Sequence, residues 1–446
     1  MRSSKRYTIV AGLAAAAALA AVAAGAWAAQ NGPGRGHTAA KTKLTFWFWG
    51  EFDAPGANKW LAQAVKSYQA AHPDISIKVV PQATDTFIAT FTAAATAKSG
   101  PDIAAQWATG PVLAQVWNGA VTPISDLAPK SQMKHWLNTS ENTYGGKLWA
   151  MPVYLIGIPW AYNKTLFAKA GVKAPLKTWT DFIGACKKLR AKGIVPFGFG
   201  DGAYWTTQLM LQDLNSLQDV VDADVGRHKF TDTKYSRFED GWKQAVDAKC
   251  FNDDVASLKV DKGQALFAAG KAAMSMGTDG QVRGWAKQLG AGKLGVMKWP
   301  VYGKGKLKNV YNATQSTSYF VTSWTKHKKE AADFLVSLHS PANLANWYRL
   351  TGVPPADDRF ATAKIKAPLD KQLYKFNTTG PQIWLQNFFP PQVDLDGNVP
   401  AQQLILGGRG DGAAAASARE RAAARWRATK KDELKNWQKF RPVLSR

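Results

Sequence analysis

The chain between residues 43 and 107 alternates between apolar runs typical of strands and apolar residues at helical spacing. The stretch KLTFWFW, residues 43–49, is rich in aromatic residues and is broken at Gly50, a composition typical of a strand. Residues 58–71 carry apolar residues three and four apart, which predicts a helix with one buried face. ISIKVVPQ, DTFIATFTAAATAKSG and PDIAAQW then continue as strand, helix and strand. This β-α-β-α-β order predicts an α/β lobe with a largely parallel sheet.

The same alternation returns after residue 152. GKLWAMPVYLIGIPWAYNK is extended and carries prolines, WTDFIGACKKLRAKG has the spacing of an amphipathic helix ending at Gly193, and VPFGFG is a short strand pattern. A second α/β lobe is therefore predicted. Two sheets joined by extended crossovers leave a cleft between them, and ligands of open α/β sheets bind at the carboxyl ends of the strands.

The last third of the chain adds one more strand pattern and several helices. TSYFVTSW predicts a strand and HKKEAADFLVSLHS a helix with one apolar face. An alanine- and arginine-rich stretch at residues 410–427 and a second stretch at 432–440 predict two further helices. We expect these basic helices to form a tail on the second lobe.

The N-terminal residues have the order of a secretory signal. Three basic residues within the first six precede an apolar, alanine-rich run at 9–24 and the triplet Ala-Trp-Ala at 26–28, which predicts a signal peptide over 1–28. An uncleaved membrane anchor is the alternative. Residues 29–43 predict a flexible leader. The region holds no cysteine for lipid attachment, so we expect a secreted protein at the extracellular face of the membrane.

The net charge and the two cysteines do not change the prediction of a secreted, two-lobed α/β protein. The formal net charge is +25, of which residues 1–43 hold +6 and residues 409–446 hold +7. This surplus allows binding to anionic polymers, but a solvated surface accounts for it as well. Cys186 and Cys250 are the two cysteines; outside the cell they either pair or remain two separate buried thiols.

Motifs for catalysis and for metal binding are missing from the sequence. The six histidines do not form an H-x-x-H or H-E-x-x-H spacing, and G-x-S-x-G and phosphate-loop patterns do not occur. Neither cysteine has a neighbouring histidine or cysteine at zinc spacing. We therefore expect a protein that is not an enzyme, with no cofactor and no metal.

Five segments in fixed order resemble one known family. They are GPDIAAQWATGPVLAQVWNGAVTPISDL, GKLWAMPVYLIGIPWAYNKTLFAKAGV, PLKTWTDFIGACKKLRAKGIVPFGFG, KGQALFAAGKAAMSMGTDGQVRGW and TSYFVTSWTKHKKEAADFLVSL. The chain from Leu44 to Trp426 is similar to the extracellular solute-binding proteins of ATP-binding cassette (ABC) sugar importers, family 1, of the maltose and oligosaccharide type. The absent lipid-attachment cysteine departs from the pattern of Gram-positive relatives.

The resemblance implies a two-lobed, periplasmic-binding-protein-like α/β fold with a ligand cleft between lobes joined by hinge crossovers. The N-terminal lobe would comprise 44–151 and 313–375, and the C-terminal lobe 152–312 and 376–446. The implied function is to capture a carbohydrate, an oligosaccharide, by hinge closure and deliver it to the transmembrane subunits of an ABC permease. The implied protein is a monomer that does not bind nucleic acid.

Two other functions stay open at this point. Paired carboxylates beside aromatic residues also equip secreted glycoside hydrolases. The basic charge allows an anionic-polymer-binding protein, whose affinity would fall steeply with salt.

A sugar site needs flat aromatic faces for C–H groups and carboxylates or amides for hydroxyls. Residues of these types lie where the family places its ligand loops, and they are Trp49, Glu51, Asp53, Gln106, Trp107, Thr109, Tyr154, Trp205, Thr278, Asp279, Trp384, Asn387 and Phe388. Three of them have a structural alternative. Trp49 could equally be a core residue. Glu51 could neutralise Lys59, and Asp53 could cap the helix that begins near Asn58.

Overall fold

The computed structural model describes residues 41–83, 86–200, 204–315 and 317–443. Residues from Lys41 onward form one compact unit. The predicted signal peptide and most of the predicted leader lie outside the described residues. Within the described ranges, none of the helices combines the length and apolar character that crossing a membrane requires.

The first sheet contains the predicted β-α-β-α-β unit. In spatial order its strands are β2 (Ile75–Pro81), β1 (Thr42–Phe48), β3 (Ile103–Trp107), β14 (Thr317–Thr322) and β4 (Val121–Thr122), with β7 (Met151–Pro152) pairing with β14. β1 is parallel to both β2 and β3, whereas β14 runs antiparallel to β3. The prediction of a largely parallel arrangement is confirmed for the N-terminal strands, and the returning chain adds the antiparallel strand.

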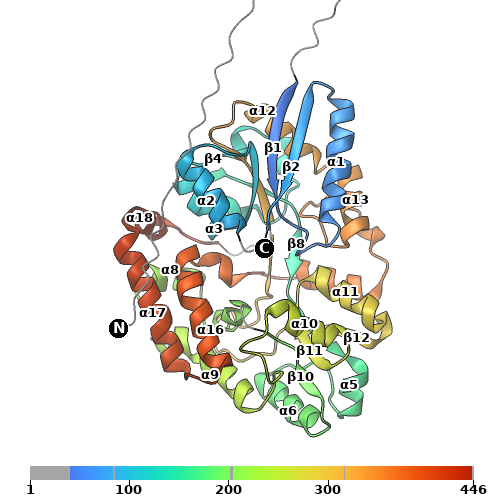
Figure 1. Ribbon diagram of the computed structural model, residues 1–446, viewed down its shortest axis with the longest axis vertical. Coiled ribbons are helices and arrows are strands. Elements are labelled where there is room, and N and C mark those ends of the chain that lie inside the picture. The colour runs from blue at the N-terminus through green and yellow to red at the C-terminus, as the bar shows by residue number, and fades with distance from the viewer. Residues whose placement is uncertain (1–40, 84–85, 201–203, 316, 444–446) are drawn as a thin grey trace, which may run out of the picture. The chain divides into compact units, whose positions relative to one another are not determined.

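Helices cover both faces of this sheet (Figure 1). One face carries α1 (Ala57–Ala71), α12 (Lys328–Ser337) and α13 (Pro341–Thr351), and the other carries α2 (Phe87–Ala97) and α3 (Gly110–Trp117). The apolar residues of α1 at helical spacing are buried as predicted. Among them Trp60 packs edge-on against Trp347 of α13, with ring centroids 4.9 Å apart, so α1 and α13 lie side by side.

The second sheet is smaller and has its own helices. Its strands, in spatial order, are β10 (Val195–Phe197), β11 (Ala272–Met276), β9 (Trp160–Asn163) and β12 (Leu294–Met297). Its helices include α5 (Lys164–Lys169), α6 (Trp179–Arg190), α9 (Thr233–Asp247), α10 (Val260–Ala268) and α11 (Asp279–Leu289). Thr178 begins α6 with a capping box shared with Asp181, which satisfies backbone amides that a helix start leaves without partners.

Two antiparallel strands connect the sheets. The chain leaves the first sheet at β7 and passes through β8 (Leu155–Gly157) to β9, and it returns through β13 (Ala313–Gln315) to β14. β8 and β13 pair with each other. Helix α14 (Pro368–Thr378) packs beside β8 and β12. The two lobes are therefore joined by a paired crossover, as the two-lobed fold class requires.

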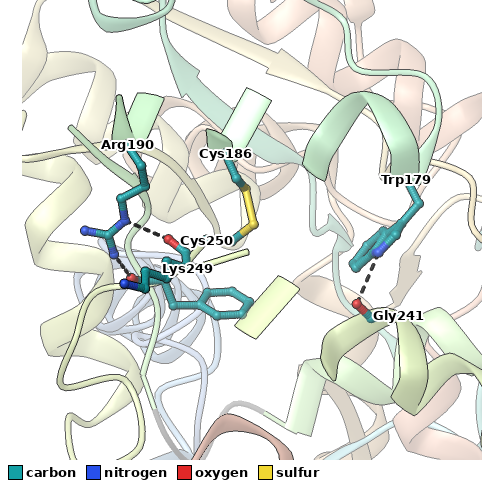
Figure 2. Close-up of a disulfide and its surroundings, with 7 residues drawn as sticks. Trp179, Cys186, Arg190, Gly241, Lys249 and Cys250 are labelled. Atoms are coloured by element: carbon teal, nitrogen blue, oxygen red, sulfur yellow. Dashed lines mark hydrogen bonds between the residues drawn. A yellow bond between two sulfur atoms is a disulfide. The ribbon is translucent and has the colours of Figure 1, made fainter. Parts of the chain in front are cut away.

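A disulfide links α6 to the segment that follows α9 (Figure 2). Cys186 of α6 is bonded to Cys250, which follows α9, and both residues are fully buried. Beside it the Arg190 side chain donates to the backbone carbonyls of Lys249, at 2.7 Å, and Phe251. The alternative of two separate thiols is therefore wrong, because the fold brings the two cysteines together.

The basic tail contacts both lobes, because Trp437 of its last helix packs against Trp117 of α3. Helix α17 (Gly412–Thr429) packs on α9 and on α16 (Val399–Leu406), and α18 (Lys431–Lys439) follows it. Arg419 is buried, and its guanidinium is 2.6 Å from the Glu239 carboxylate of α9. The alanine-rich sequence leaves room for this close approach.

Shorter elements complete the described chain. They are α4 (Lys130–Met133), β5 (Thr143–Tyr144), β6 (Lys147–Leu148), α7 (Gln208–Leu211), α8 (Gln218–Asp224), α15 (Pro391–Val393), a π-helical turn at Asp394–Asn398, and 3₁₀ helices at Ile124–Asp126, Thr139–Asn142, Tyr204–Thr207, Ala291–Lys293, Thr362–Lys364 and Leu385–Phe388.

Candidate functional site

An aromatic platform lies at the carboxyl ends of β1 and β3, and we define it as Trp49, Phe87 and Trp107. Trp49 stacks on Phe87 with ring centroids 5.1 Å apart and planes 7° from parallel. Trp107 packs edge-on against both rings, at 5.7 Å from Trp49 and 5.1 Å from Phe87. Trp49 is 3% exposed, whereas Trp107 is only partly buried, so Trp107 offers the more accessible surface.

Phe87 was not among the predicted site residues. Phe87 is the first residue of α2. An apolar residue at this place in an amphipathic helix is usually a core residue, so the sequence pattern does not mark it as a ligand contact. Because β1 pairs with β3 in parallel, the segments after the two strands lie at the same edge of the sheet. Trp49 and Trp107 both contact Phe87 there.

Two buried polar side chains, Gln106 and Thr109, precede and follow Trp107 in the sequence. Gln106 is fully buried in β3, directly opposite Ser318 of β14. Neither its amide oxygen nor its amide nitrogen has a hydrogen-bond partner among the described residues, and the same holds for the hydroxyl of Thr109. Thr109 also has a positive φ of 62°, a strained backbone conformation that clusters at ligand sites. Most buried polar groups have a protein or water partner, so these groups are candidates to contact a ligand.

A chain of hydrogen bonds fixes the backbone at Thr109. Its amide donates to Asn142 Oδ1 at 3.2 Å, Asn142 Nδ2 donates to Ser318 Oγ at 2.6 Å, and Ser318 Oγ donates to Gln315 Oε1 at 3.1 Å. Gln315 Nε2 continues to the carbonyl of Asn138 at 3.2 Å. No local sequence pattern indicates this chain, because directly bonded partners are up to 177 residues apart.

The two predicted acids after β1 have different environments. The exposed Glu51 carboxylate accepts hydrogen bonds from the amides of Gly56, at 2.8 Å, and Asn58, at 2.7 Å. It therefore holds the start of α1, the role that was considered for Asp53. Asp53 is buried at 8% exposure, and its backbone carbonyl faces the second lobe.

Thr278 forms the opposite side of that contact. Its hydroxyl accepts from the amide of Gln281 at 3.2 Å, within a capping box that begins α11. The same hydroxyl donates to the carbonyl oxygen of Asp53 at 3.2 Å. Gly280 lies so close that a Cβ atom there would be 2.5 Å from this oxygen. The start of α11 therefore meets the loop after β1 through the Thr278 hydroxyl and the Asp53 backbone carbonyl.

Asp279 lies at the junction of α11 with the crossover. It is 1% exposed, and its Oδ2 accepts from the Gly157 amide of β8 at 3.0 Å and from Asn377 Nδ2 of α14. Burial raises the pKa of this carboxyl to about 7, and the hydrogen bonds from Asn377 and Gly157 act in the opposite direction. The structure therefore places Asp279 against the hinge segments.

Tyr154 also belongs to the crossover region. It is fully buried, its hydroxyl is 3.0 Å from Thr317 Oγ1, and its ring stacks on Trp347 at 4.9 Å. These contacts fix the segment just before β8 against the first lobe.

The predicted residues near position 386 approach the first lobe at α3. Trp384 Nε1 donates to Gln386 Oε1 at 3.2 Å, and Asn387 and Phe388 lie in the following 3₁₀ helix. A Cβ atom at Gly110 would be 2.6 Å from the Asn387 carbonyl oxygen. This close approach explains the glycine directly after Thr109.

Two cavities show which predicted residues lie together. A cavity of 40 Å³ is bounded by Trp107 and Asn387, and a larger one of 310 Å³ by Thr109, Glu141 and Phe388. The predicted residues of the β3 end and of the 384–388 segment are therefore neighbours. The side chain of Trp205 lies outside the described part of the structure.

Comparisons with known proteins identify the family of the chain. The family described as bacterial extracellular solute-binding protein matches residues 63–370. The chain is 23% identical over 249 residues to the multiple sugar-binding protein of Streptococcus mutans, covering 52% of this chain and 57% of that protein. It is 26% identical over 237 residues to the melibiose/raffinose/stachyose-binding protein MelE of Bacillus subtilis, covering 49% and 53%. The chain thus spans about half the length of these curated relatives.

A solved structure extends the likeness to the whole fold. A chitin oligosaccharide binding protein superposes with a TM-score of 0.76 at 21% identity, covering 87% of this chain and 99% of that one. At this level of identity the likeness concerns the fold, and it supports the two-lobed architecture described above.

Proposed function

Because the chain belongs to the bacterial extracellular solute-binding proteins, we propose that it captures a carbohydrate outside the cell and delivers it to an ABC permease. It binds the sugar without cleaving it, acts as a monomer and reaches the cell surface by its N-terminal signal. The ligand is an oligosaccharide, in line with the names of the raffinose- and chitin-oligosaccharide-binding relatives.

The aromatic platform at the end of β3, with polar groups before and after Trp107 that have no partner in the described chain, is the observation that carries the proposal. A pyranose ring has a face of C–H groups that packs on a flat aromatic ring, and hydroxyls at its rim that need hydrogen-bond partners. Trp107 offers the ring, while the buried amide of Gln106 and the hydroxyl of Thr109 offer donors and acceptors without described partners. A neutral polar ligand satisfies such groups without introducing a charge.

The contact between α11 and the loop after β1 supports capture by closure. The Thr278 hydroxyl and the Asp53 carbonyl belong to different lobes, and the chain crosses between the lobes at β8, at β13 and near α14. Hinge closure around a ligand is a common way for two lobes to enclose it.

Isothermal titration calorimetry with raffinose, melibiose, maltotriose and chitobiose tests this function. We expect heat with at least one sugar, and we expect Trp107→Ala to weaken that binding. Trp324→Ala is the matched control, because Trp324 is also partly buried but contacts Pro101 at the opposite end of β3. Absence of heat with every sugar, together with binding of another solute, would contradict the carbohydrate assignment. Release of shorter sugars during long incubation would show a glycoside hydrolase.

A further inference from the structure

A second site lies on the second lobe and shares no lining residue with the aromatic platform. It is a groove of 530 Å³ beside β12, and we call it the Lys298 groove. The side chains that matter for its chemistry are Tyr162, Lys177, Lys298, Lys308, Tyr311 and Phe376. Three of these six are lysines, and no aspartate or glutamate is among the residues that line the groove.

Lys298 is the central cation of this groove. Its ammonium lies 5.5 Å from the ring centroid of Tyr311 and 5.8 Å from that of Phe376, so two aromatic faces contact the positive charge. Partial burial lowers the pKa of Lys298, and no carboxylate among the described residues forms an ion pair with it. The Lys298 side chain is exposed, so its ammonium is accessible to a ligand, and an anion there would form a charge-assisted contact.

The rest of the lining adds apolar surface and neutral amide side chains. The carbonyl of Val296 already accepts from the side chain of Gln372 at 3.2 Å. Lys177 is the least available cation, because the Asp181 carboxylate accepts from its amide at 3.1 Å and lies near its charge. Lys298 and Lys308 therefore carry the positive charge that the groove offers.

We propose that the Lys298 groove binds a small oxyanion carried on a ring, such as a sugar acid or a sugar phosphate. The carboxylate or phosphate contacts the Lys298 ammonium, and the ring packs on Tyr162 and Phe376 at the open side. This ligand differs in charge from the neutral oligosaccharide of the platform, so the site is independent of the proposed function.

Titration calorimetry with glucuronate and with glucose 6-phosphate tests the groove, and methyl glucoside is the neutral control. We expect at least one anion to bind, and Lys298→Met to weaken it at least tenfold. Lys293→Met is the matched control, because Lys293 is exposed on the same lobe and does not line the groove; it should leave the affinity unchanged. Unchanged thermal melting of both variants separates loss of binding from loss of folding.

Trp107→Ala separates this proposal from the proposed function. It should weaken neutral oligosaccharide binding and leave anion binding unchanged. Absence of heat with both anions, equal affinity in wild type and Lys298→Met, or loss of anion binding in Trp107→Ala would each overturn the assignment. Comparing the two anions shows whether carboxylate or phosphate is preferred.

Discussion

The hydroxyl of Thr278 and the backbone carbonyl of Asp53 are joined by a hydrogen bond of 3.2 Å between the two lobes. The acceptor is a backbone oxygen, so this contact does not depend on the aspartate side chain. The first turn of α11 can approach this closely because residue 280 is a glycine. The contact between the lobes can therefore be tested by adding a methyl group at residue 280.

Gly280→Ala should weaken sugar binding at least tenfold. The new Cβ would lie 2.5 Å from the Asp53 carbonyl oxygen and 3.1 Å from the Pro55 ring, so the lobes would have to separate. Gly284→Ala is the control in the same helix, since a Cβ there meets no atom within 4 Å. Both changes favour the helix by roughly 0.5–1 kcal/mol. Calorimetry gives the affinities, and equal affinity in the two variants would show that closure does not need this contact.

Trp49→Ala and Trp107→Ala should differ in stability although both weaken sugar binding. Trp49 is buried and stacked on Phe87, and removal of such a core ring costs about 3–5 kcal/mol of unfolding free energy. Trp107 is partly exposed, so its removal should cost less. Urea denaturation measures the two losses. A stable Trp49→Ala variant would mean that the platform is less tightly packed than its ring contacts indicate.

Glu51→Ala should reduce stability and leave sugar affinity nearly unchanged. The carboxylate accepts from two amides at the start of α1, and loss of a helix-capping acceptor costs about 1 kcal/mol. Glu51→Gln keeps one acceptor oxygen and should recover part of the loss. If affinity falls more than tenfold while stability stays constant, Glu51 is a ligand residue, as the family resemblance implied.

Asp279→Asn should change how stability depends on pH. Burial raises the pKa of the Asp279 carboxyl from 3.8 to about 7, so the folded state binds this proton more tightly than the unfolded state. Its contribution is complete below the unfolded pKa and is lost as pH rises toward about 7, with a slope of at most ~1.4 kcal/mol per pH unit. The variant lacks this titration.

Urea denaturation at several pH values between 4 and 8 measures that difference. The unfolding free energy of the wild type should fall relative to Asp279→Asn as the pH rises. Parallel curves for the two proteins would show that the carboxyl does not titrate in this range.

Replacing both cysteines by alanine should lower the unfolding free energy by about 4 kcal/mol. The Cys186–Cys250 bond closes a loop of 64 residues, and a cross-link of this length restricts the unfolded chain to that extent in the chain-entropy account. Reductant should have little effect on the folded protein, because both sulfur atoms are buried. A variant with wild-type melting would show that the hydrogen bonds of Arg190 and Trp179 suffice to hold α6.

The order of strands and helices was predictable because their apolar periodicity is strong. The helix expected at 58–71 is observed at Ala57–Ala71, and the strand expected at 43–49 at Thr42–Phe48. The meeting of Trp49 with Trp107 also follows from parallel strands, whose carboxyl ends share one edge of the sheet.

Other parts of the site depend on tertiary structure. Asn142 and Ser318 meet although they are 176 residues apart, and no local pattern announces such a pair. The choice of Glu51 over Asp53 as the acceptor for the start of α1 depends on the path of the loop between them and Gly56. Periodicity does not specify that path.

The position of β14 has a consequence for biosynthesis. This strand occupies the interior of the first sheet, between β3 and β4, yet it is residues 317–322 of the chain. An emerging polypeptide therefore completes its N-terminal lobe only after nearly three quarters of the molecule has been synthesised. Until then β3 and β4 lack their shared neighbour, and the first sheet is incomplete at its centre.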